Sequence, residues 1–217
     1  MAKGSTKVTI SLEGANSAVF TVESDYLKFG RYRQTGDGDN VEEWDPQPIE
    51  WQILSIDTEN KRVLLLSRYG LDAMFFVRQD GSNYWGNSVV CDWLNGDFYG
   101  TAFDETEKAK IKATELSDVN FNGRTYDGDT CNVFLLSTSE ADTYFADDEA
   151  RKCLATAYAK KNYPDVYEGN AYGYWWLRSP FTRIRGYVYS VSSLGSIGEF
   201  PAFGFSILVR PALWIEL

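Results

Sequence analysis

Three oxygen-bearing side chains near the middle of the chain have a spacing that suits a metal ion: Asp127, Asp129 and Asn132. Carboxylate and amide oxygens are the ligands of Ca²⁺, but an EF-hand loop also needs a Glu at its twelfth position, and none follows here. The turn preferences of Asp and Gly favour a solvated turn over a calcium site by about four to one. We therefore expect no bound metal.

The composition removes most other catalytic chemistry, because the 217 residues include no histidine. This excludes Ser-His-Asp and Cys-His nucleophile systems, His-ligated zinc or iron, and a histidine pH switch. Asp and Glu total 31, so a carboxylate pair for glycoside hydrolysis stays open, although no spacing singles one out. We predict a protein that is not an enzyme and uses no cofactor.

The cysteines and the net charge limit the disulfide content and the classes of partner. Cys91, Cys131 and Cys153 form no CxxC pair, which favours buried free thiols; one disulfide with a spare thiol is the alternative. The formal charge of −10 argues against nucleic-acid or anionic-membrane partners, since both need basic faces. No stretch approaches the roughly 18 apolar residues of a membrane span. The N-terminus has no charged-then-apolar leader.

Aromatic residues make up 16% of the chain, and the most distinctive string is YWWLRSP at 174–180. Adjacent aromatics on a strand face opposite sides, so at least one side must be packed and the other is available to be open. The burial preference of Trp favours core packing over a binding role by about three to one. Arg178 is expected to fix a turn by binding carbonyls or a buried carboxylate. The segment 209–215 is expected to be a closing strand.

Between these two strings lies the interval 181–206, which holds six aromatic residues and only three charges. It lacks clean strand alternation and looks like aromatic-bearing loops. Tyr, Phe, Arg, Ser and Gly together are typical of recognition surfaces. Composition alone leaves recognition and core packing about equal for this interval.

The elements that must position these residues follow from periodicity. Alternation predicts strands at 8–12, 18–22, 27–30 and 49–56, and an apolar run predicts another at 62–67, with 57–61 as a hairpin turn. Helices are expected at 88–94, ending at Gly96, and at 151–161. Capping boxes at Asp104/Glu107 and Ser137/Glu140 begin two more, and the run 147–149 should lie in a first helical turn. We expect 116–130 to be a loop, and the whole chain to be one α+β domain with helices inserted between early and late strands.

Eight ordered strings resemble a known family. They are FGRY (29–32), PIEW (48–51), LLSRYGLDA (65–73), WLNGDFY (93–99), VFLLS (133–137), TAYA (156–159), WWLRSP (175–180) and VRPALW (209–214). The chain is similar to the variable proteins of diversity-generating retroelements. The match covers about 27–217 and leaves 1–26 as an N-terminal extension or extra strands.

This resemblance implies a C-type-lectin-like fold of the formylglycine-generating-enzyme type, with mixed and antiparallel strands. It implies a structural scaffold of Trp175, Trp176, Arg178, Arg210 and Trp214, with Val191, Gly195 and Ile197 as fixed framework. The enzymes of this fold use a late reactive cysteine pair or a His-ligated iron, and neither is found in the corresponding segment here.

The interval 181–206 would then be a ligand-facing variable region. Mutation of adenines turns the Asn codons AAY into NNY codons, which never encode Lys, Gln, Glu, Met or Trp. Of those five types, the interval contains Glu199 alone. The positions expected to vary and to bind ligand are Phe181, Thr182, Arg183, Ile184, Arg185, Tyr187, Tyr189, Ser190, Ser192, Leu194, Phe200, Phe203, Phe205 and Ser206.

The function expected from these observations is non-enzymatic recognition of a protein or glycan partner through the aromatic-rich late interval. The alternatives are a carbohydrate-binding or carbohydrate-active domain, and a structural module of a larger surface protein. A cell surface or a phage particle is the favoured location, and a cytoplasmic one also fits the acidic composition.

Overall fold

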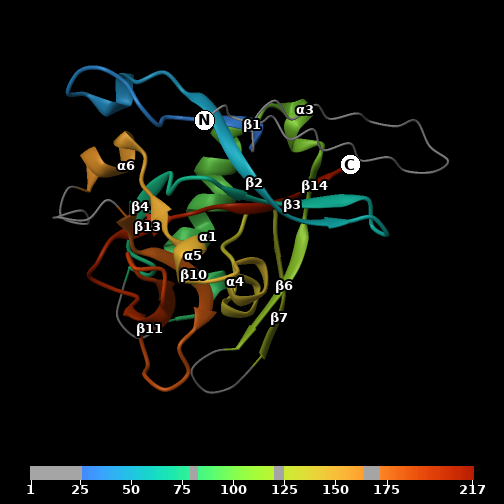
Figure 1. Ribbon diagram of the computed structural model, residues 1–217, viewed down its shortest axis with the longest axis vertical. Helices are drawn as coiled ribbons and strands as arrows, with labels where there is room; N and C mark the ends of the chain where they lie inside the picture. Colours follow the sequence, from blue (N-terminus) through green and yellow to red (C-terminus); the bar gives the residue numbers. More distant parts are fainter. Residues whose placement is uncertain (1–25, 79–82, 120–124, 164–171) are drawn as a thin grey trace.

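The computed structural model describes residues 26–78, 83–119, 125–163 and 172–217. They form a mixed α+β fold with mostly antiparallel sheets and several short helices (Figure 1). The strands expected at 8–12 and 18–22 lie outside the described residues. No helix in the described ranges is long and apolar enough to cross a membrane.

The first sheet joins early strands of the chain to its last strand. Its five strands lie in the order β1 (Leu27–Tyr32), β2 (Gln47–Asp57), β3 (Arg62–Ser67), β14 (Ala212–Glu216) and β5 (Ile111–Lys112). The predicted β2–β3 hairpin is confirmed. Its turn is fixed by Asp57, which accepts hydrogen bonds from the backbone N–H and the amide of Asn60 at 3.0 and 2.8 Å.

The second sheet is built mainly from the last quarter of the chain. Its order is β12 (Ile197–Pro201), β11 (Tyr187–Val191), β10 (Trp175–Pro180), β13 (Ile207–Val209) and β4 (Asp72–Met74). All its pairs are antiparallel except β10–β13. The strand β12 therefore lies at an edge of the sheet, and both β11 and β12 belong to the interval 181–206 that was expected to bind ligand.

Arg210 and Pro211 carry the chain from the second sheet to the first. The expectation of one strand over 209–215 is therefore wrong: β13 ends at Val209 and β14 begins at Ala212. Pro211 has no N–H to continue a ladder, while its carbonyl accepts a 2.8 Å bond from the Ser67 backbone of the neighbouring sheet. This switch point buries the Arg210 side chain between the two sheets.

Two short ribbons were not expected from the sequence. They are β6 (Thr114–Val119) with β7 (Thr125–Cys131), and β8 (Cys153–Leu154) with β9 (Tyr172–Gly173). The interval 116–130 is thus largely a hairpin and not a loop. The second ribbon begins inside the helix expected at 151–161, because Cys153 pairs with Gly173 and the Leu154 carbonyl accepts from the Gly70 backbone at 2.9 Å.

The helical elements are short, and most lie in the middle of the chain. They are η1 (Val41–Glu43), η2 (Trp85–Asn87), α1 (Val89–Trp93), the π-helical η3 (Leu94–Phe98), α2 (Tyr99–Ala102), α3 (Glu105–Lys108), α4 (Thr138–Tyr144), α5 (Asp148–Arg151) and α6 (Ala157–Asn162).

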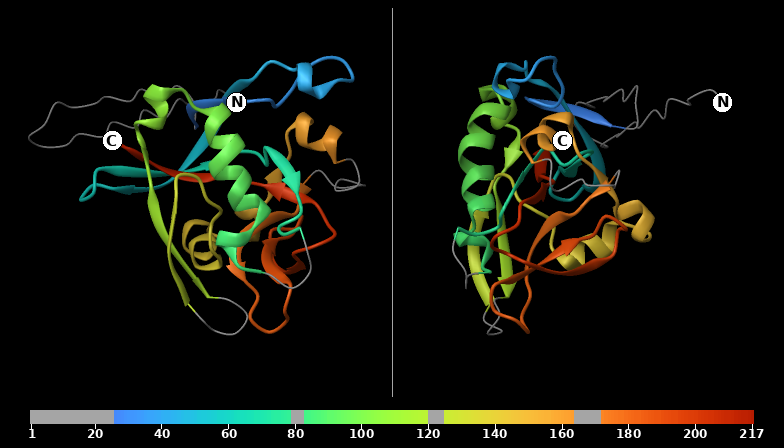
Figure 2. Two further views of the ribbon diagram at one scale, coloured as in Figure 1. Left: turned by 180° about the vertical axis from the view of Figure 1, so that it is seen from behind. Right: turned by 90° about the vertical axis from the view of Figure 1, so that its left-hand side faces the viewer.

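The elements α1, η3 and α2 form one continuous helical stretch, drawn in green in Figure 2. Gly96 does not end it, because the buried side chains of Leu94 and Phe98 keep the following turn against the core. Of the helix expected at 151–161, only the second half forms, as α6, because α5 ends at Arg151 and β8 follows it. Thr156 caps α6 by accepting from the Ala159 backbone at 3.1 Å.

Both predicted capping boxes are confirmed. Asp104 and Glu107 bond each other's backbone N–H groups at the start of α3, and Ser137 and Glu140 do the same at the start of α4. The acidic run 147–149 also lies where it was expected: Asp147 caps α5 by accepting from the Ala150 backbone at 2.9 Å. Glu107 of α3 also accepts from the Gly30 backbone of the first sheet, whereas α4 and α5 contact the second sheet through Arg178 and Gly195.

Candidate ligand-binding surface

The tryptophans of β10 form the base of the candidate surface. Trp175 and Trp176 face opposite sides of the strand, and both are completely buried. Trp175 donates from its indole to the Arg151 carbonyl at 3.1 Å, and Trp176 donates to the Met74 carbonyl at 2.8 Å. Neither side of this strand is therefore open to solvent, although the sequence allowed one side to be open. Trp214, on β14, is half-buried, with the Arg62 guanidinium 4.3 Å from its ring.

Arg178 ties β10 to α4. Its guanidinium donates to the Leu135 carbonyl at 2.7 Å and to both carboxylate oxygens of Glu140, one of them at 3.2 Å. Glu140 is the residue that closes the Ser137 capping box, so one carboxylate both begins a helix and neutralises a buried arginine. The expected contact of Arg178 with a carbonyl and a carboxylate is confirmed.

The fourteen residues expected to bind ligand fall into three groups. Buried are Phe181 and Ser190. Half-buried are Tyr187, Tyr189, Ser192, Phe200 and Ser206; exposed are Thr182, Arg183, Ile184, Arg185, Leu194, Phe203 and Phe205. We call the exposed group the late surface. Phe181 lies under it, with its ring 5.3 Å from that of Tyr189, so this side chain acts as support.

The topology divides the late surface between two ends of the β11–β12 hairpin. At one end, the loops 181–186 and 202–206 meet through a 2.9 Å bond from the Ala202 backbone to the Gly186 carbonyl. At the other end lies the hairpin turn with Leu194. Five-residue strands separate the two ends by about 17 Å. The loops lie toward the opposite end of the long axis from β1 (Figure 1).

The hairpin turn is held by a residue expected to be framework. Gly195 has a φ of +91°, and a Cβ on it would lie 1.7 Å from the Asp148 carbonyl oxygen. Arg151 in turn donates to the Gly195 carbonyl at 2.9 Å. Only glycine fits this close approach to α5, so Leu194 is presented from a fixed turn.

The candidate calcium ligands Asp127, Asp129 and Asn132 do not form a site among the described residues. Asp129 accepts a hydrogen bond from the Tyr84 hydroxyl, and the Asn132 backbone donates to Asn95 at 2.8 Å. The Asp127 side chain lies outside the described residues. Among the described residues no cluster of three acidic or cysteine side chains is placed to hold a metal.

The three cysteines are buried and free, which confirms the favoured interpretation of the sequence. The Cys91 and Cys131 sulfurs lie 3.9 Å apart within the core. Their shared hydrogen bond, together with burial, raises the pKa of Cys91, while the same bond lowers the pKa of Cys131. The late segment 172–217 contains no cysteine.

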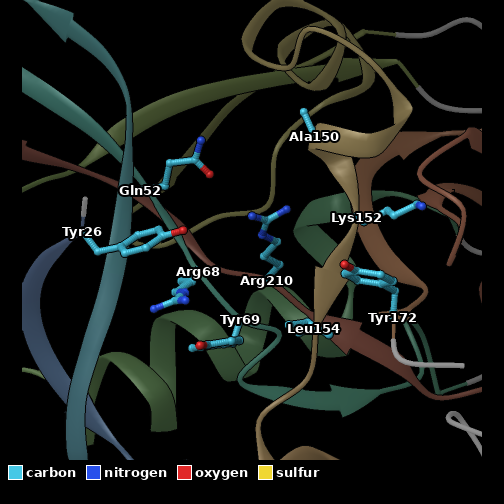
Figure 3. A pocket seen from close by; sticks show the side chains of 9 residues that line it. All are labelled: Tyr26, Gln52, Arg68, Tyr69, Ala150, Lys152, Leu154, Tyr172 and Arg210. Carbon is cyan, nitrogen blue, oxygen red and sulfur yellow. The ribbon is translucent and has the colours of Figure 1, made fainter. Parts of the chain in front are cut away.

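Sequence reasoning missed one feature, a pocket on the side of the first sheet. Its cavity volume is about 210 Å³, and it is lined by Tyr26, Gln52, Arg68, Tyr69, Ala150, Lys152, Leu154, Tyr172 and Arg210 (Figure 3). We call it the Arg210 pocket. Arg68 and Arg210 both belong to strings that carried the family resemblance, but nothing in their spacing showed that they would meet.

Fold and surface together define an α+β domain with mostly antiparallel sheets and an exposed, aromatic-bearing set of late loops. A family model matches residues 60–217, and the chain belongs to that family, the domain of unknown function DUF6273. The match runs from the β2–β3 turn to the last residue, so it includes the late surface and Arg210, and the family description assigns no activity to either. No curated protein and no solved structure matches the chain.

Proposed function

We propose that this protein is a non-enzymatic recognition protein whose late surface captures a protein or glycan partner. One observation carries the proposal. Among the described residues, the four most exposed large hydrophobic side chains are Ile184, Leu194, Phe203 and Phe205, at 46–71% exposure. All four lie within 181–206. The other three exposed ones, Ile56, Phe75 and Leu154, reach only 37–38%.

The contrast with the layer beneath supports the proposal. A fully buried Leu or Phe side chain gains roughly 1.5–3 kcal/mol over an exposed one, and the late loops forgo this gain at four positions. Directly below them, Trp175, Trp176 and Leu177 are completely buried. Apolar side chains displayed on a rigid base are typical of interaction sites, in which a few aromatic and arginine anchors supply most of the affinity.

The C-type-lectin-like fold and diversification by a retroelement are part of the same proposal. Its support is that most of the expected variable positions lie on loops between the strands of one sheet. Of the expected framework residues, Val191 and Gly195 are buried and Ile197 is half-buried. Loops on a rigid scaffold tolerate substitution better than core positions do. Ser190 and Phe181 would then vary least freely, because their side chains have no solvent to enter.

The geometry favours a protein over a single sugar as the partner. Leu194 lies about 17 Å from the end that carries Ile184 and Phe203, which is the length of a five-residue strand. A standard protein interface covers about 800 Å² on each partner and reaches both ends. The Phe200 ring lies 5.7 Å from that of Phe205 and extends the aromatic surface of the loop end onto the edge strand β12. A glycan partner would have to be an extended oligosaccharide.

A binding panel of surface proteins and glycans tests this proposal. The variant L194S/F203S/F205S removes three anchors, and I56S/F75S removes exposed apolar side chains elsewhere as the control. We expect ligands of the wild type to lose at least about ten-fold in affinity in the first variant and little in the control. A ligand bound equally by both variants, or turnover of a bound glycan, would refute the proposal.

A further inference from the structure

The Arg210 pocket lies where four parts of the chain converge. Gln52 lies on β2 and Tyr26 directly precedes β1, while Arg68 and Tyr69 follow β3. Ala150 and Lys152 come from the end of α5, and Leu154 and Tyr172 belong to the β8–β9 ribbon. Arg210 forms its floor. Figure 3 shows the hydroxyl groups of Tyr26 and Tyr172 pointing toward Arg210 from opposite sides. The lining is thus cationic and aromatic in a protein whose formal charge is −10.

Arg210 is only 3% exposed, yet no carboxylate among residues 26–78, 83–119, 125–163 and 172–217 forms an ion pair with it. Its Nε donates to the Ser67 carbonyl at 3.0 Å, and one terminal nitrogen lies 3.5 Å from the Arg151 carbonyl. Its other terminal nitrogen has no hydrogen-bond acceptor among the described residues, and no carboxylate in those residues pairs with it. A buried and unpaired charge is costly, so such groups are normally matched by an ion.

The other two cations of the pocket are already neutralised. Arg68 forms an ion pair with Glu50 at 2.6 Å, and Lys152 forms one with Glu149 at 2.6 Å. Counting both pairs as neutral leaves one positive charge, that of Arg210. Burial lowers the pKa of Arg210, but a guanidinium does not lose its proton in a protein, so the site cannot neutralise itself.

The Arg210 guanidinium is held in one orientation before any ligand arrives. It lies 5.0 Å from the Trp175 ring centre and 5.5 Å from that of Phe145, and the Ser67 carbonyl fixes its Nε. A planar, fixed guanidinium presents two parallel N–H groups, which match the two oxygens of a carboxylate. Because the Arg210 side chain is already ordered, ligand binding costs it little conformational entropy, which favours affinity.

We propose that the Arg210 pocket binds a small organic molecule with a single carboxylate and a ring-shaped body. The single uncompensated charge selects a monoanion over a phosphate dianion. The tyrosine rings of Tyr26, Tyr69 and Tyr172 suit either an aromatic ring or the face of a sugar ring, and about 210 Å³ is below the range of drug-sized ligands. This site is separate from the late surface and does not depend on it.

Titration calorimetry on the full chain tests the proposal with two monocarboxylates, benzoate and glucuronate. Their neutral counterparts are benzamide and glucose, and inorganic phosphate serves as the dianion. We expect at least one carboxylate to bind and its neutral counterpart to bind at least about ten-fold more weakly. Whichever carboxylate binds tells an aromatic acid from an acidic sugar as the natural source.

Two variants assign the binding to the pocket. Arg210→Lys keeps the charge but loses the fork, and Leu154→Trp fills the cavity from a half-exposed rim position; each should weaken carboxylate binding by about ten-fold or more. Arg78→Lys makes the same exchange at an exposed arginine outside both sites, and as the matched control it should change nothing. If Arg210→Lys fails to fold, Leu154→Trp still decides.

Four results would overturn the proposal. They are the absence of binding by both carboxylates up to about 10 mM, equal binding of a neutral counterpart, tighter binding of phosphate, and unchanged binding in Leu154→Trp. The variant L194S/F203S/F205S should leave carboxylate binding intact, so this proposal and that of the late surface can fail independently.

Discussion

The late surface and the Arg210 pocket depart from ordinary protein packing in opposite ways. The late surface exposes apolar side chains such as Leu194 and Phe205 on loops, above a core that is fully buried. The pocket buries the charge of Arg210 under tyrosine rings. The late surface leaves apolar area unburied, and the pocket holds a charge that no carboxylate in the described part of the chain pairs with.

The difference indicates the size of what each region binds. Apolar side chains spread over about 17 Å can be covered only by a large partner. A single buried guanidinium in a cavity of about 210 Å³ is satisfied by one small anion. The two regions therefore predict two separate binding events, and each can be changed without the other.

The largest expected effect distinguishes the scaffold from the surface that it carries. Trp176→Ala removes a completely buried ring and should lower the free energy of unfolding by about 3–5 kcal/mol. Phe203→Ala removes an exposed aromatic ring from a loop and should change the free energy of unfolding by about 0.5 kcal/mol or less. Urea denaturation measures both. Equal losses would mean that Phe203 belongs to the core and not to a binding surface.

The next prediction concerns a buried charge that, unlike Arg210, can neutralise itself. Asp72 is buried beside the Tyr32 hydroxyl, which donates to it at 2.7 Å, and burial raises its pKa to about 6. The folded protein therefore holds a proton that the unfolded chain has already lost between about pH 4 and pH 6. The free energy of unfolding should fall as pH rises through this window, by on the order of 3 kcal/mol.

Denaturation of the wild type and Asp72→Asn at several pH values checks this. The variant should gain on the order of 3 kcal/mol relative to the wild type between pH 4 and pH 7, because an amide does not titrate. Tyr32→Phe removes a hydrogen bond that lowers the pKa of Asp72, so its window should shift to higher pH. If the free energies of unfolding of the wild type and Asp72→Asn differ by a constant amount between pH 4 and pH 7, Asp72 is charged throughout this range.

A smaller effect is expected where Glu140 joins the scaffold. Glu140→Ala removes the counterion of the buried Arg178 and the second half of a capping box, which should cost about 2–3 kcal/mol. Glu105→Ala breaks the exposed pair with Lys108 and should cost about 0.5 kcal/mol or less. Thermal unfolding compares the two variants. A loss in Glu140→Ala no larger than that in the control would mean that Arg178 is stabilised by its carbonyl contacts alone.

Local signals in the sequence predicted local structure well. The capping residues Asp104 and Ser137 begin helices as expected, because their partners lie three residues away. The β2–β3 hairpin forms because the Asp57 side chain fixes its own turn. In each case the stabilising contact is contained in the pattern that was interpreted.

Contacts between distant segments decided the rest. The helix expected over 151–161 is interrupted because Cys153 pairs with Gly173, and the strand expected over 209–215 divides because Pro211 meets Ser67 of another sheet. The Arg210 pocket brings together residues from Tyr26 to Arg210. No periodicity records such a meeting, so the exposed late loops were predictable as a class of surface and the pocket was not.

The central claim is that the late surface varies for recognition while its scaffold stays fixed. Sequencing this gene from independent isolates, together with the neighbouring DNA, tests it most directly. The account predicts substitutions concentrated at exposed positions such as Ile184, Leu194 and Phe203, an unchanged Trp175-Trp176 pair, and a nearby reverse transcriptase with a near-copy of codons 181–206. Substitutions spread evenly over scaffold and surface, with neither of these neighbours, would contradict it.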